Sequence, residues 1–378
     1  MSLFSSTSSF AFLFLLACLS APAANGEVGE FDLPDVIPIP MGAVQELREL
    51  VRTDAEAQEV VAELSEEAER YLMDEPTPLR VIHYEGLVNT DPKRIDTVEK
   101  LRQAGHAGTL VKYWQATGDS RAEATLRKWI DAWFSTYELT GNDVNENKLF
   151  PMLVGYDYLR DTFRRAERER IDRFVRELGE LHVRAVKESS HFTNRYTKHV
   201  RLAAICGMIL GKSEWVELAH EGVQRYVSES LYGDGETRDL RHRDTLTYHS
   251  SSLRPAIQLA MLSGTRGKSL YAWENERGGS LEKSVDYVVP YALGEKVHRE
   301  WVDSKVRLDQ RRAEAGIEKY QIGSLYDPQH ARQLMEQAAF FDPDLMRVVQ
   351  HLGKGEAERF PTWQTLVNAA MNLNLKTE

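Results

Sequence analysis

Residues 166–231 read AERERIDRFVRELGELHVRAVKESSHFTNRYTKHVRLAAICGMILGKSEWVELAHEGVQRYVSESL. Three segments of this stretch, 166–187, 197–210 and 214–231, carry apolar residues at every third or fourth position, and Ser189-Ser190 and Gly211 separate them. Such spacing places the apolar side chains on one face of a helix. Short serine or glycine breaks are typical of turns between helices. The stretch therefore predicts three consecutive helices that pack as antiparallel neighbours.

The same helical pattern continues on both sides. It recurs before the stretch at 43–72, 95–116, 121–137 and 148–163, and after it at 248–262, 280–293, 329–340 and 343–352. No alternating strand pattern persists, and no short repeat of fixed length appears, which disfavours a regular solenoid. We therefore predict one all-α domain over residues 27–378, in which paired helices close into a toroid. Two charged stretches, 233–245 and 294–323, are predicted to be loops over a cleft.

The N-terminus predicts export. Residues 10–19 are apolar but too few to span a membrane comfortably, and Ala21-Pro22-Ala23 has the small-x-small form of a signal peptidase site. Residues 1–26 are interpreted as a signal peptide, although no Lys or Arg precedes the apolar run. This predicts a secreted or periplasmic protein without a membrane span. Lipid attachment at Cys18 is the alternative.

Composition narrows the classes of partner. The chain has 378 residues, 42% of them hydrophobic, which is enough to build a large core without a disulfide. Cys206 lies in an apolar run, which predicts an inert buried thiol. The formal net charge of -11 argues against a nucleic-acid partner. An acidic polymer would require a locally basic cleft, because salt confines most electrostatic effects to about 8 Å.

Residues 191–199, HFTNRYTKH, concentrate polar side chains just before an apolar helix. Asn194 lies near the expected start of that helix, where its simplest role is to cap it. The amide of Asn194, helped by His199, can also hydrogen-bond a carboxylate and stabilise developing charge, as an oxyanion hole does. Arg195 and Tyr196 belong to the same segment and are predicted to contact substrate.

Residues 239–249, DLRHRDTLTYH, form a second polar segment. Arg241 and Tyr248 are seven residues apart, as are His242 and His249, and seven residues along a helix return to nearly the same face. A guanidinium held beside a phenol favours the phenolate, which is a general base. The alternative interpretation is an exposed basic turn with Tyr248 packed at the cleft edge.

These residue types fit β-elimination of a uronic acid. The proton on C5 is hard to remove while the adjacent carboxylate carries a negative charge, so hydrogen-bond donors must neutralise that carboxylate. A base then takes the proton, and an acid protonates the departing oxygen at C4. Tyr248 can do both where proton and leaving group lie on the same side of the ring, whereas opposite sides require a separate base such as His199.

The same residues resemble a known family. Asn194 ahead of a helix, the seven-residue spacing from Arg241 to Tyr248 followed by His249, and the sequence YDYL at 156–159 are similar to the alginate-lyase domain of mannuronate-specific lyases. The resemblance covers about residues 80–300. It implies an incomplete (α/α) toroid, with catalytic roles for Arg241, Tyr248 and Asn194.

The chain departs from the family at one position. The family usually places a His directly after the Asn, whereas Arg195 follows Asn194 here. His199, Arg195 and Tyr196 are the alternatives for the missing role. This divergence leaves β-mannuronan and β-glucuronan as comparable substrates.

The remaining predicted contacts are mostly basic or aromatic. Residues expected to bind the polymer, besides Arg195 and Tyr196, are Lys148, Tyr156, His242, His249, Lys296 and His298. No phosphate loop, Cys pair or zinc-helix motif is present, and Arg241 and Arg243 would repel a metal from the nearby histidines, so no metal or cofactor is predicted. The alternative function is a toroid that binds an acidic glycan without cleaving it.

Overall fold

The structure, a computed structural model, describes residues 36–353 and 358–377. Within these residues helices dominate and no strand forms, because the only β pairings are two isolated antiparallel bridges, Leu231 with Thr237 and Arg299 with Leu325. The all-α prediction is confirmed. The predicted signal peptide, residues 1–26, and Cys18 lie outside the described residues.

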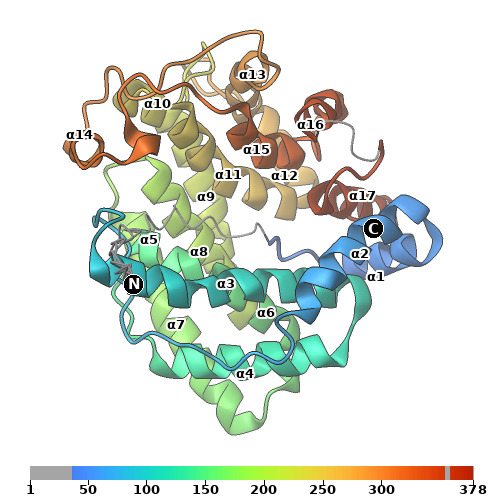
Figure 1. Cartoon of the computed structure of the whole chain (residues 1–378). Coiled ribbons are helices and arrows are strands. Elements are labelled where there is room, and N and C mark those ends of the chain that lie inside the picture. Colours follow the sequence, from blue (N-terminus) through green and yellow to red (C-terminus); the bar gives the residue numbers. More distant parts are fainter. Residues whose placement is uncertain (1–35, 354–357, 378) are drawn as a thin grey trace, which may run out of the picture.

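The helices follow one another with short connections (Figure 1). The first half contains α1 (Met41–Thr53), α2 (Ala55–Glu69), α3 (Pro92–Thr117), α4 (Ser120–Thr136), α5 (Asp143–Glu146), α6 (Phe150–Leu159), α7 (Arg165–Glu188) and α8 (Asn194–Leu210). The second half contains α9 (Ser213–Ser230), α10 (Arg238–Arg243), α11 (Leu246–Leu262), α12 (Gly264–Ala272), α13 (Leu281–Ala292), α14 (Arg307–Glu314), α15 (Arg332–Ala338), α16 (Met346–Gly353) and α17 (Trp363–Thr377). The described residues also contain five short 3-10 turns, η1 (Asn147–Leu149), η2 (Arg160–Thr162), η3 (Glu318–Tyr320), η4 (Pro328–Ala331) and η5 (Pro343–Leu345).

Helix α8 is shared by the two parts of the hydrophobic core. One face carries Val200 into a cluster with α1, α2 and most of the later helices, and the other carries Ile205 into a cluster with α3, α4, α6 and α7. Its neighbours α7 and α9 lie on either side, as the patterns at 166–231 predict. Gly179 allows α7 and α9 to pack closely, because a Cβ at this position would lie 2.1 Å from the ring of Trp215 on α9. Helix α8 ends at Gly211, whose φ of 65° suits glycine.

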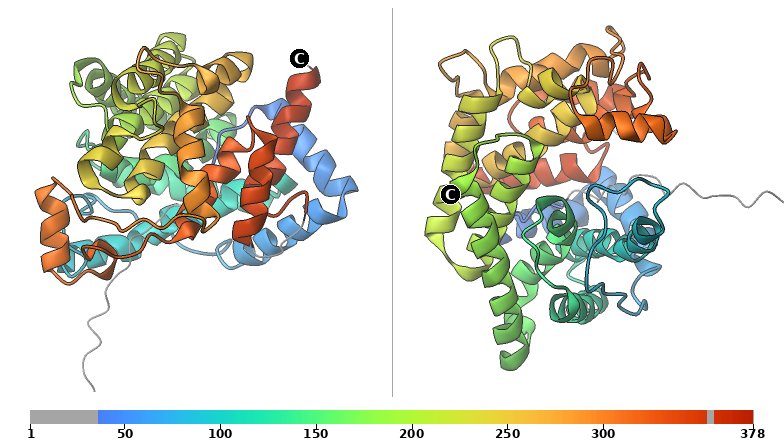
Figure 2. Two further views of the ribbon diagram at one scale, coloured as in Figure 1. Left: turned by 90° about the horizontal axis from the view of Figure 1, so that it is seen from above. Right: turned by 90° about the vertical axis from the view of Figure 1, so that its left-hand side faces the viewer.

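The earlier and later helices form two halves around α8. Helices α3, α4, α6 and α7 lie in the lower half of Figure 1, and α9 to α16 in the upper half. Helix α17 packs on α1, so the last described helix meets the first, as Figure 2 also shows. Antiparallel pairs thus build the incomplete (α/α) toroid that was predicted.

Sequence patterns misplaced several elements. The segment 233–245, predicted to be a loop, contains α10, and the segment 294–323 contains α14 and η3. Helices α12 and α17 were not predicted at all. Helix α8 begins three residues earlier than its apolar pattern indicates, so Asn194 to Tyr196 lie in its first turn. This last difference matters, because it changes the role of Asn194.

Candidate active site

A cleft of about 720 Å³ opens where the start of α8 meets α10, α11, α14 and α15. Its lining is strongly basic although the whole chain carries a formal net charge of -11. The Lys and Arg side chains that line it are Lys148, Arg195, Lys198, Arg201, Arg243, Arg254, Arg312, Lys319 and Arg332. Glu85 and Asp239 are the acidic residues that line it within the described chain. The molecule therefore contains the locally basic cleft that an acidic polymer requires.

Asn194 is one of the residues that line this cleft. It is the first residue of α8 and is 5% exposed, while Thr193 occupies the N-cap position. The carboxylate of Asp239 accepts a hydrogen bond of 2.8 Å from the backbone N–H of Asn194 and so caps the helix from α10. Within the described residues, the amide of Asn194 has no hydrogen-bond partner. Helix capping therefore does not occupy it.

Asp239 is itself unusual. Its side chain is buried, at 2% exposure, and burial raises its pKa to about 7 while Arg243 and the N–H of Asn194 act in the opposite direction. A carboxyl group at a cleft wall with such a pKa can exist in both protonation states near neutral pH. No sequence pattern around Asp239 predicts this buried environment.

Tyr248 lies in the first turn of α11 and faces the same cleft. The guanidinium carbon of Arg243 lies 3.4 Å from the centroid of its ring, and Nη1 of Arg312 donates to its hydroxyl at 3.3 Å. Trp301 contacts the ring edge-on, with centroids 5.7 Å apart. The phenol therefore has the guanidinium neighbour that was predicted, but from another arginine.

Arg241 does not lie beside Tyr248, which corrects the sequence interpretation. Its guanidinium pairs with Asp234 and Glu236 and stacks 3.6 Å from the ring centroid of Tyr232, away from the cleft lining. The seven-residue helical register fails because α10 ends at Arg243. Asp244 then takes a left-handed conformation, with φ of 51°, before α11 begins.

Arg195 lines the cleft and is held from behind. Its Nε and Nη2 lie 2.8 and 2.6 Å from Oδ1 of Asp143, a fully buried carboxylate of α5, and its Nη1 lies 3.2 Å from Glu85. Arg195 is thus a fixed cation next to Asn194. This is the position at which the resembling family has a His.

His199 does not line the cleft, although it was predicted to act there. Its Nδ1 lies 2.7 Å from Nδ1 of His182, whose Nε2 lies 2.9 Å from a carboxylate oxygen of buried Glu146. Burial lowers the pKa of His199 to about 4, with Asp143 opposing the shift, so the imidazole is neutral at neutral pH. The Nε2 of His199 lies 3.7 Å from Asp143, the carboxylate that pairs with Arg195. His199 therefore belongs to the buried group of residues behind Arg195.

Two further predicted residues, Lys148 and His242, do line the cleft. The Nζ of Lys148 lies 4.3 Å from the ring centroid of Tyr84, which also lines the cleft. Partial burial lowers the pKa of His242, and neighbouring cations, chiefly Lys305 and Arg243, lower it further. His242 is therefore a neutral hydrogen-bonding group at neutral pH.

The other predicted contacts are structural or lie elsewhere. Tyr196 and Tyr156 are buried in the core, and Tyr156 donates to Asp172. His249 is fully buried with Nε2 2.8 Å from the carbonyl oxygen of Ser284, and burial lowers its pKa to about 4. Exposed Lys296 and half-buried His298 are not part of the cleft lining. Aromatic and histidine residues at helical spacing were here packing residues, which is the commoner outcome.

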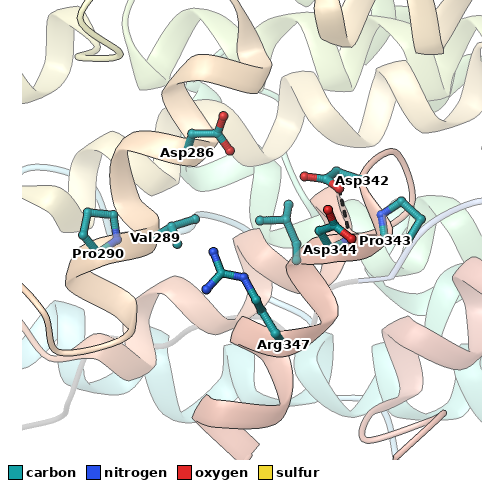
Figure 3. A pocket seen from close by; sticks show the side chains of 8 residues that line it. Asp286, Val289, Pro290, Asp342, Pro343, Asp344 and Arg347 are labelled. Atoms are coloured by element: carbon teal, nitrogen blue, oxygen red, sulfur yellow. Dashed lines mark hydrogen bonds between the residues drawn. The ribbon is translucent and has the colours of Figure 1, made fainter.

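A second cavity, of about 690 Å³, lies between α13 and the η5–α16 junction (Figure 3). Asp286, Asp342 and Asp344 line it together with a single cation, Arg347. These carboxylates would repel a polyanion, so this cavity is unsuited to such a substrate. No group of three or more His, Cys, Asp or Glu side chains in the described residues could hold a metal. None of the described helices is long and apolar enough to cross a membrane.

Comparisons with known proteins agree with this fold. Residues 47–298 match the model of the alginate lyase family. A solved alginate lyase from Bacteroides ovatus has a TM-score of 0.61 at 13% sequence identity, over 89% of this chain and 99% of that chain. A histidine-to-alanine variant of alginate lyase A1-III in complex with a tetrasaccharide has a TM-score of 0.53 at 17% identity, over 81% of this chain and 89% of that chain. No curated protein sequence matches the chain. At these identities the structural likeness establishes the fold.

Proposed function

This chain belongs to the alginate lyase family and is a polysaccharide lyase by that membership, and we propose that it cleaves an acidic uronic-acid polymer by β-elimination. One observation carries the proposal. The amide of Asn194 and the phenol of Tyr248 line a single cleft whose walls are rich in Lys and Arg. A basic wall attracts the polymer, and the amide and the phenol supply the chemistry.

Neutralising the uronate carboxylate is the first requirement. We assign it to Asn194 and Arg195, which are adjacent in the first turn of α8 and both line the cleft. Asp143 fixes the guanidinium of Arg195, so little reorganisation is needed when a carboxylate arrives. A permanent cation, Arg195, would then take the role of the His that the family usually has at this position.

Tyr248 is the proposed base and acid. Its phenolate oxygen takes the C5 proton, the C–H electrons form the C4=C5 double bond, and the C4–O bond breaks. The departing oxygen receives the proton from the newly formed phenol, which restores the phenolate. Arg243, rather than Arg241, is the proposed guanidinium that favours the phenolate, because it lies over the ring.

This mechanism favours particular polymers. A single residue can serve as base and acid only where the C5 proton and the C4 oxygen lie on the same side of the ring. β-Mannuronate and β-glucuronate share that arrangement, whereas guluronate has the opposite configuration at C5. The position of His199 outside the cleft lining supports same-side elimination, because no second base is then available from it. We therefore propose mannuronan or glucuronan as substrate, over guluronan.

Each turnover creates a conjugated 4,5-ene, whose ultraviolet absorbance provides the test. Purified protein is incubated with poly-mannuronate, poly-guluronate and glucuronan. We expect absorbance to rise with poly-mannuronate or with glucuronan, and to rise least with poly-guluronate. Binding without any rise would identify a non-catalytic glycan-binding protein and contradict the proposal.

The role of Tyr248 has its own test. Tyr248→Phe is expected to lower kcat by at least about 10²-fold with little change in substrate affinity, because it removes only the phenolic oxygen that accepts and returns the proton. Tyr113→Phe is the matched control, since that hydroxyl donates to Asp119 and lies outside the cleft lining. Comparable rates for Tyr248→Phe and Tyr113→Phe would remove Tyr248 from the mechanism.

We also propose that the protein is exported after cleavage near residue 26. Sequencing of the mature N-terminus tests this. Recovery of an intact chain beginning at Met1 from the source cells would contradict it.

A further inference from the structure

The part of the chain beyond the family match contributes one wall of the cleft. The match ends at residue 298, whereas α14 and η3 follow it and bring Arg312 and Lys319 to the cleft lining. Arg312 reaches furthest into the proposed chemistry, because its Nη1 donates to the hydroxyl of Tyr248 at 3.3 Å. Its side chain is 12% exposed, and its guanidinium carbon lies 4.6 Å from the ring centroid of Tyr320.

Arg312 is the second of two guanidiniums on the same phenol. Arg243 lies over the ring face, whereas Arg312 lies at the hydroxyl, so the two contact different parts of Tyr248. A single buried carboxylate joins them. Asp309 pairs with Arg243 through both of its oxygens, and its Oδ1 lies 3.9 Å from Nη1 of Arg312. The hydroxyl of Ser304 donates to the same carboxylate.

Two guanidiniums and one carboxylate, that of Asp309, therefore lie around the phenol of Tyr248. A cation attracts a nearby anion more strongly in a partly dehydrated cleft than in water, so each guanidinium would attract a phenolate at Tyr248.

From this arrangement we propose that Arg312 is a further catalytic residue, which donates to the oxygen of Tyr248 and favours the phenolate that starts the reaction. The inference rests on the proposed role of Tyr248 as the base. It extends that role by assigning the hydrogen bond at the reacting atom to a residue outside the family match.

The backbone around α14 is fixed in a way that supports this role. Trp301 has a φ of 69°, and its N–H donates to the carbonyl oxygen of Asp244, the other non-glycine residue with a positive φ among the described residues. Its indole N–H donates to the carbonyl oxygen of Lys319, and the ring is 2% exposed. Strained backbone persists only where its surroundings over-determine it, and such places gather at functional sites. These contacts tie the segment carrying Arg312 to the junction between α10 and α11.

Other charged groups lie around the same cleft and must be kept constant in a test. The other carboxylate and histidine side chains of the lining are Glu85, Asp239, His242 and His330, and the other cations besides Arg243 are Lys148, Arg195, Lys198, Arg201, Arg254, Lys319 and Arg332. None of them changes when Arg312 alone is substituted. A difference between variant and parent protein therefore reports on Arg312.

The direct test follows ionisation of Tyr248 without substrate. Protein labelled with carbon-13 at the phenolic carbon of tyrosine is titrated by NMR, and the resonance missing from Tyr248→Phe assigns the signal. Arg312→Gln should move the ionisation of Tyr248 to higher pH by about 1 unit or more. Arg312→Lys, which keeps the charge, should move it less, and exposed Arg311→Gln on the same helix should not move it. An unchanged titration in folded Arg312→Gln overturns the inference.

Kinetics on the active polymer give a second readout. Arg312→Gln should lower kcat by about 10²-fold, as loss of one charge-stabilising donor does, and shift the rising limb of the pH–rate profile to higher pH. Added guanidinium ion should restore part of the rate to Arg312→Ala. A uniform loss of rate at every pH without such rescue would indicate a merely structural role and contradict the inference.

The two proposals fail in different ways. If no uronan is cleaved, the proposed function fails, but the NMR titration still decides whether Arg312 acts on Tyr248. If the parent protein is active, Tyr248→Phe is inactive and the titration of Tyr248 ignores Arg312, only the further inference fails.

Discussion

The side chain of Asn194 is not needed to cap helix α8 and is therefore available for chemistry. Residues at the start of a helix usually cap it with their own side chains, but the carboxylate of Asp239 receives the backbone N–H of Asn194 instead. The amide is then available at the cleft surface, 5% exposed. An amide held in this way needs no rearrangement to meet a developing negative charge.

Substitution of Asn194 separates the two interpretations of this residue. Asn194→Ala should lower kcat by about 10²- to 10³-fold, because one charge-stabilising donor is lost. Its melting temperature should remain close to that of the parent protein, because the backbone N–H still donates to Asp239. A loss of only a few-fold, or a large fall in Tm, would favour a purely structural role. Rates from the absorbance assay and thermal unfolding curves provide the two measurements.

Arg241 and Arg243 allow a second test at the same scale. They are two residues apart, yet Arg241 pairs with acidic residues outside the cleft lining and Arg243 lies over Tyr248. We expect Arg243→Ala to lower kcat by at least about 10²-fold and Arg241→Ala to change it by less than about 3-fold, as for an exposed ion pair. Each arginine is the control for the other. The reverse order of effects would restore the role that the sequence assigned to Arg241.

The sequence could identify this segment but not the arginine within it. Both candidates lie in DLRHRD, and spacing alone favoured the one that is seven residues from Tyr248. That argument assumes a continuous helix, and neither Asp244 nor Thr245 is a strong helix breaker. The break arises from tertiary contacts, because the carbonyl and carboxylate of Asp244 accept from the N–H groups of Trp301 and Asp303. No local sequence pattern points to Arg312, because its contact with Tyr248 joins residues that are 64 positions apart.

At the scale of elements, the turn between α10 and α11 is the critical junction. Asp244 adopts a left-handed conformation there, with φ of 51°, which a β-carbon disfavours by roughly 1–2 kcal/mol. Asn and Asp tolerate this conformation best among non-glycine residues. The turn sets the direction of α11 and therefore the position of Tyr248 relative to Arg243.

Substitutions at Asp244 should show this conformational demand. Asp244→Asn keeps a side-chain oxygen for the N–H of Asp303 and should change stability little. Asp244→Ala loses that acceptor and tolerates the turn poorly, so it should destabilise the protein by about 1–2 kcal/mol. Asp244→Gly should fall between them, because it relieves the backbone but loses the hydrogen bond. Urea unfolding measures all three, and equal stability of the Ala and Asn variants would contradict the account.

Helix patterns were most successful where packing is local. The segments at 166–187, 197–210 and 214–231 correspond to α7, α8 and α9 within a few residues. These helices contact their chain neighbours, so apolar periodicity and the Gly211 break contain the necessary information. Helix α14 has mostly charged side chains, so it lacks such an apolar pattern, and its buried residue is Asp309. Its position depends on the Asp309–Arg243 ion pair, which no local pattern reveals.

At the scale of the whole molecule, net charge and local charge have opposite signs. The chain carries a formal charge of -11, yet Lys and Arg dominate the lining of one cleft while Asp residues dominate the lining of the second cavity. Both cavities lie on the same incomplete helical toroid, in which α17 packs on α1. The fold thus segregates charge that the sequence intersperses. Composition alone could not locate the basic cleft, because its residues come from helices distant in the chain.

This segregation predicts a specific salt dependence. Attraction between a basic cleft and a long polyuronate is screened as the Debye length falls from about 10 Å at 0.1 M salt toward 3 Å at 1 M. The KM for the polymer should therefore rise several-fold between low and high salt. The kcat should change much less, because the contacts at the reacting sugar are short and partly dehydrated.

Variants outside and inside the cleft sharpen that prediction. Lys198→Gln removes a cation from the cleft lining and should both raise KM and reduce its dependence on salt. Lys212→Gln removes an equal charge from the ring of Trp215, outside the lining, and should leave both nearly unchanged. Steady-state rates at several NaCl concentrations distinguish the two variants. Equal effects of the Lys198 and Lys212 substitutions would mean that overall charge governs binding. That result would contradict binding of the polymer in the cleft.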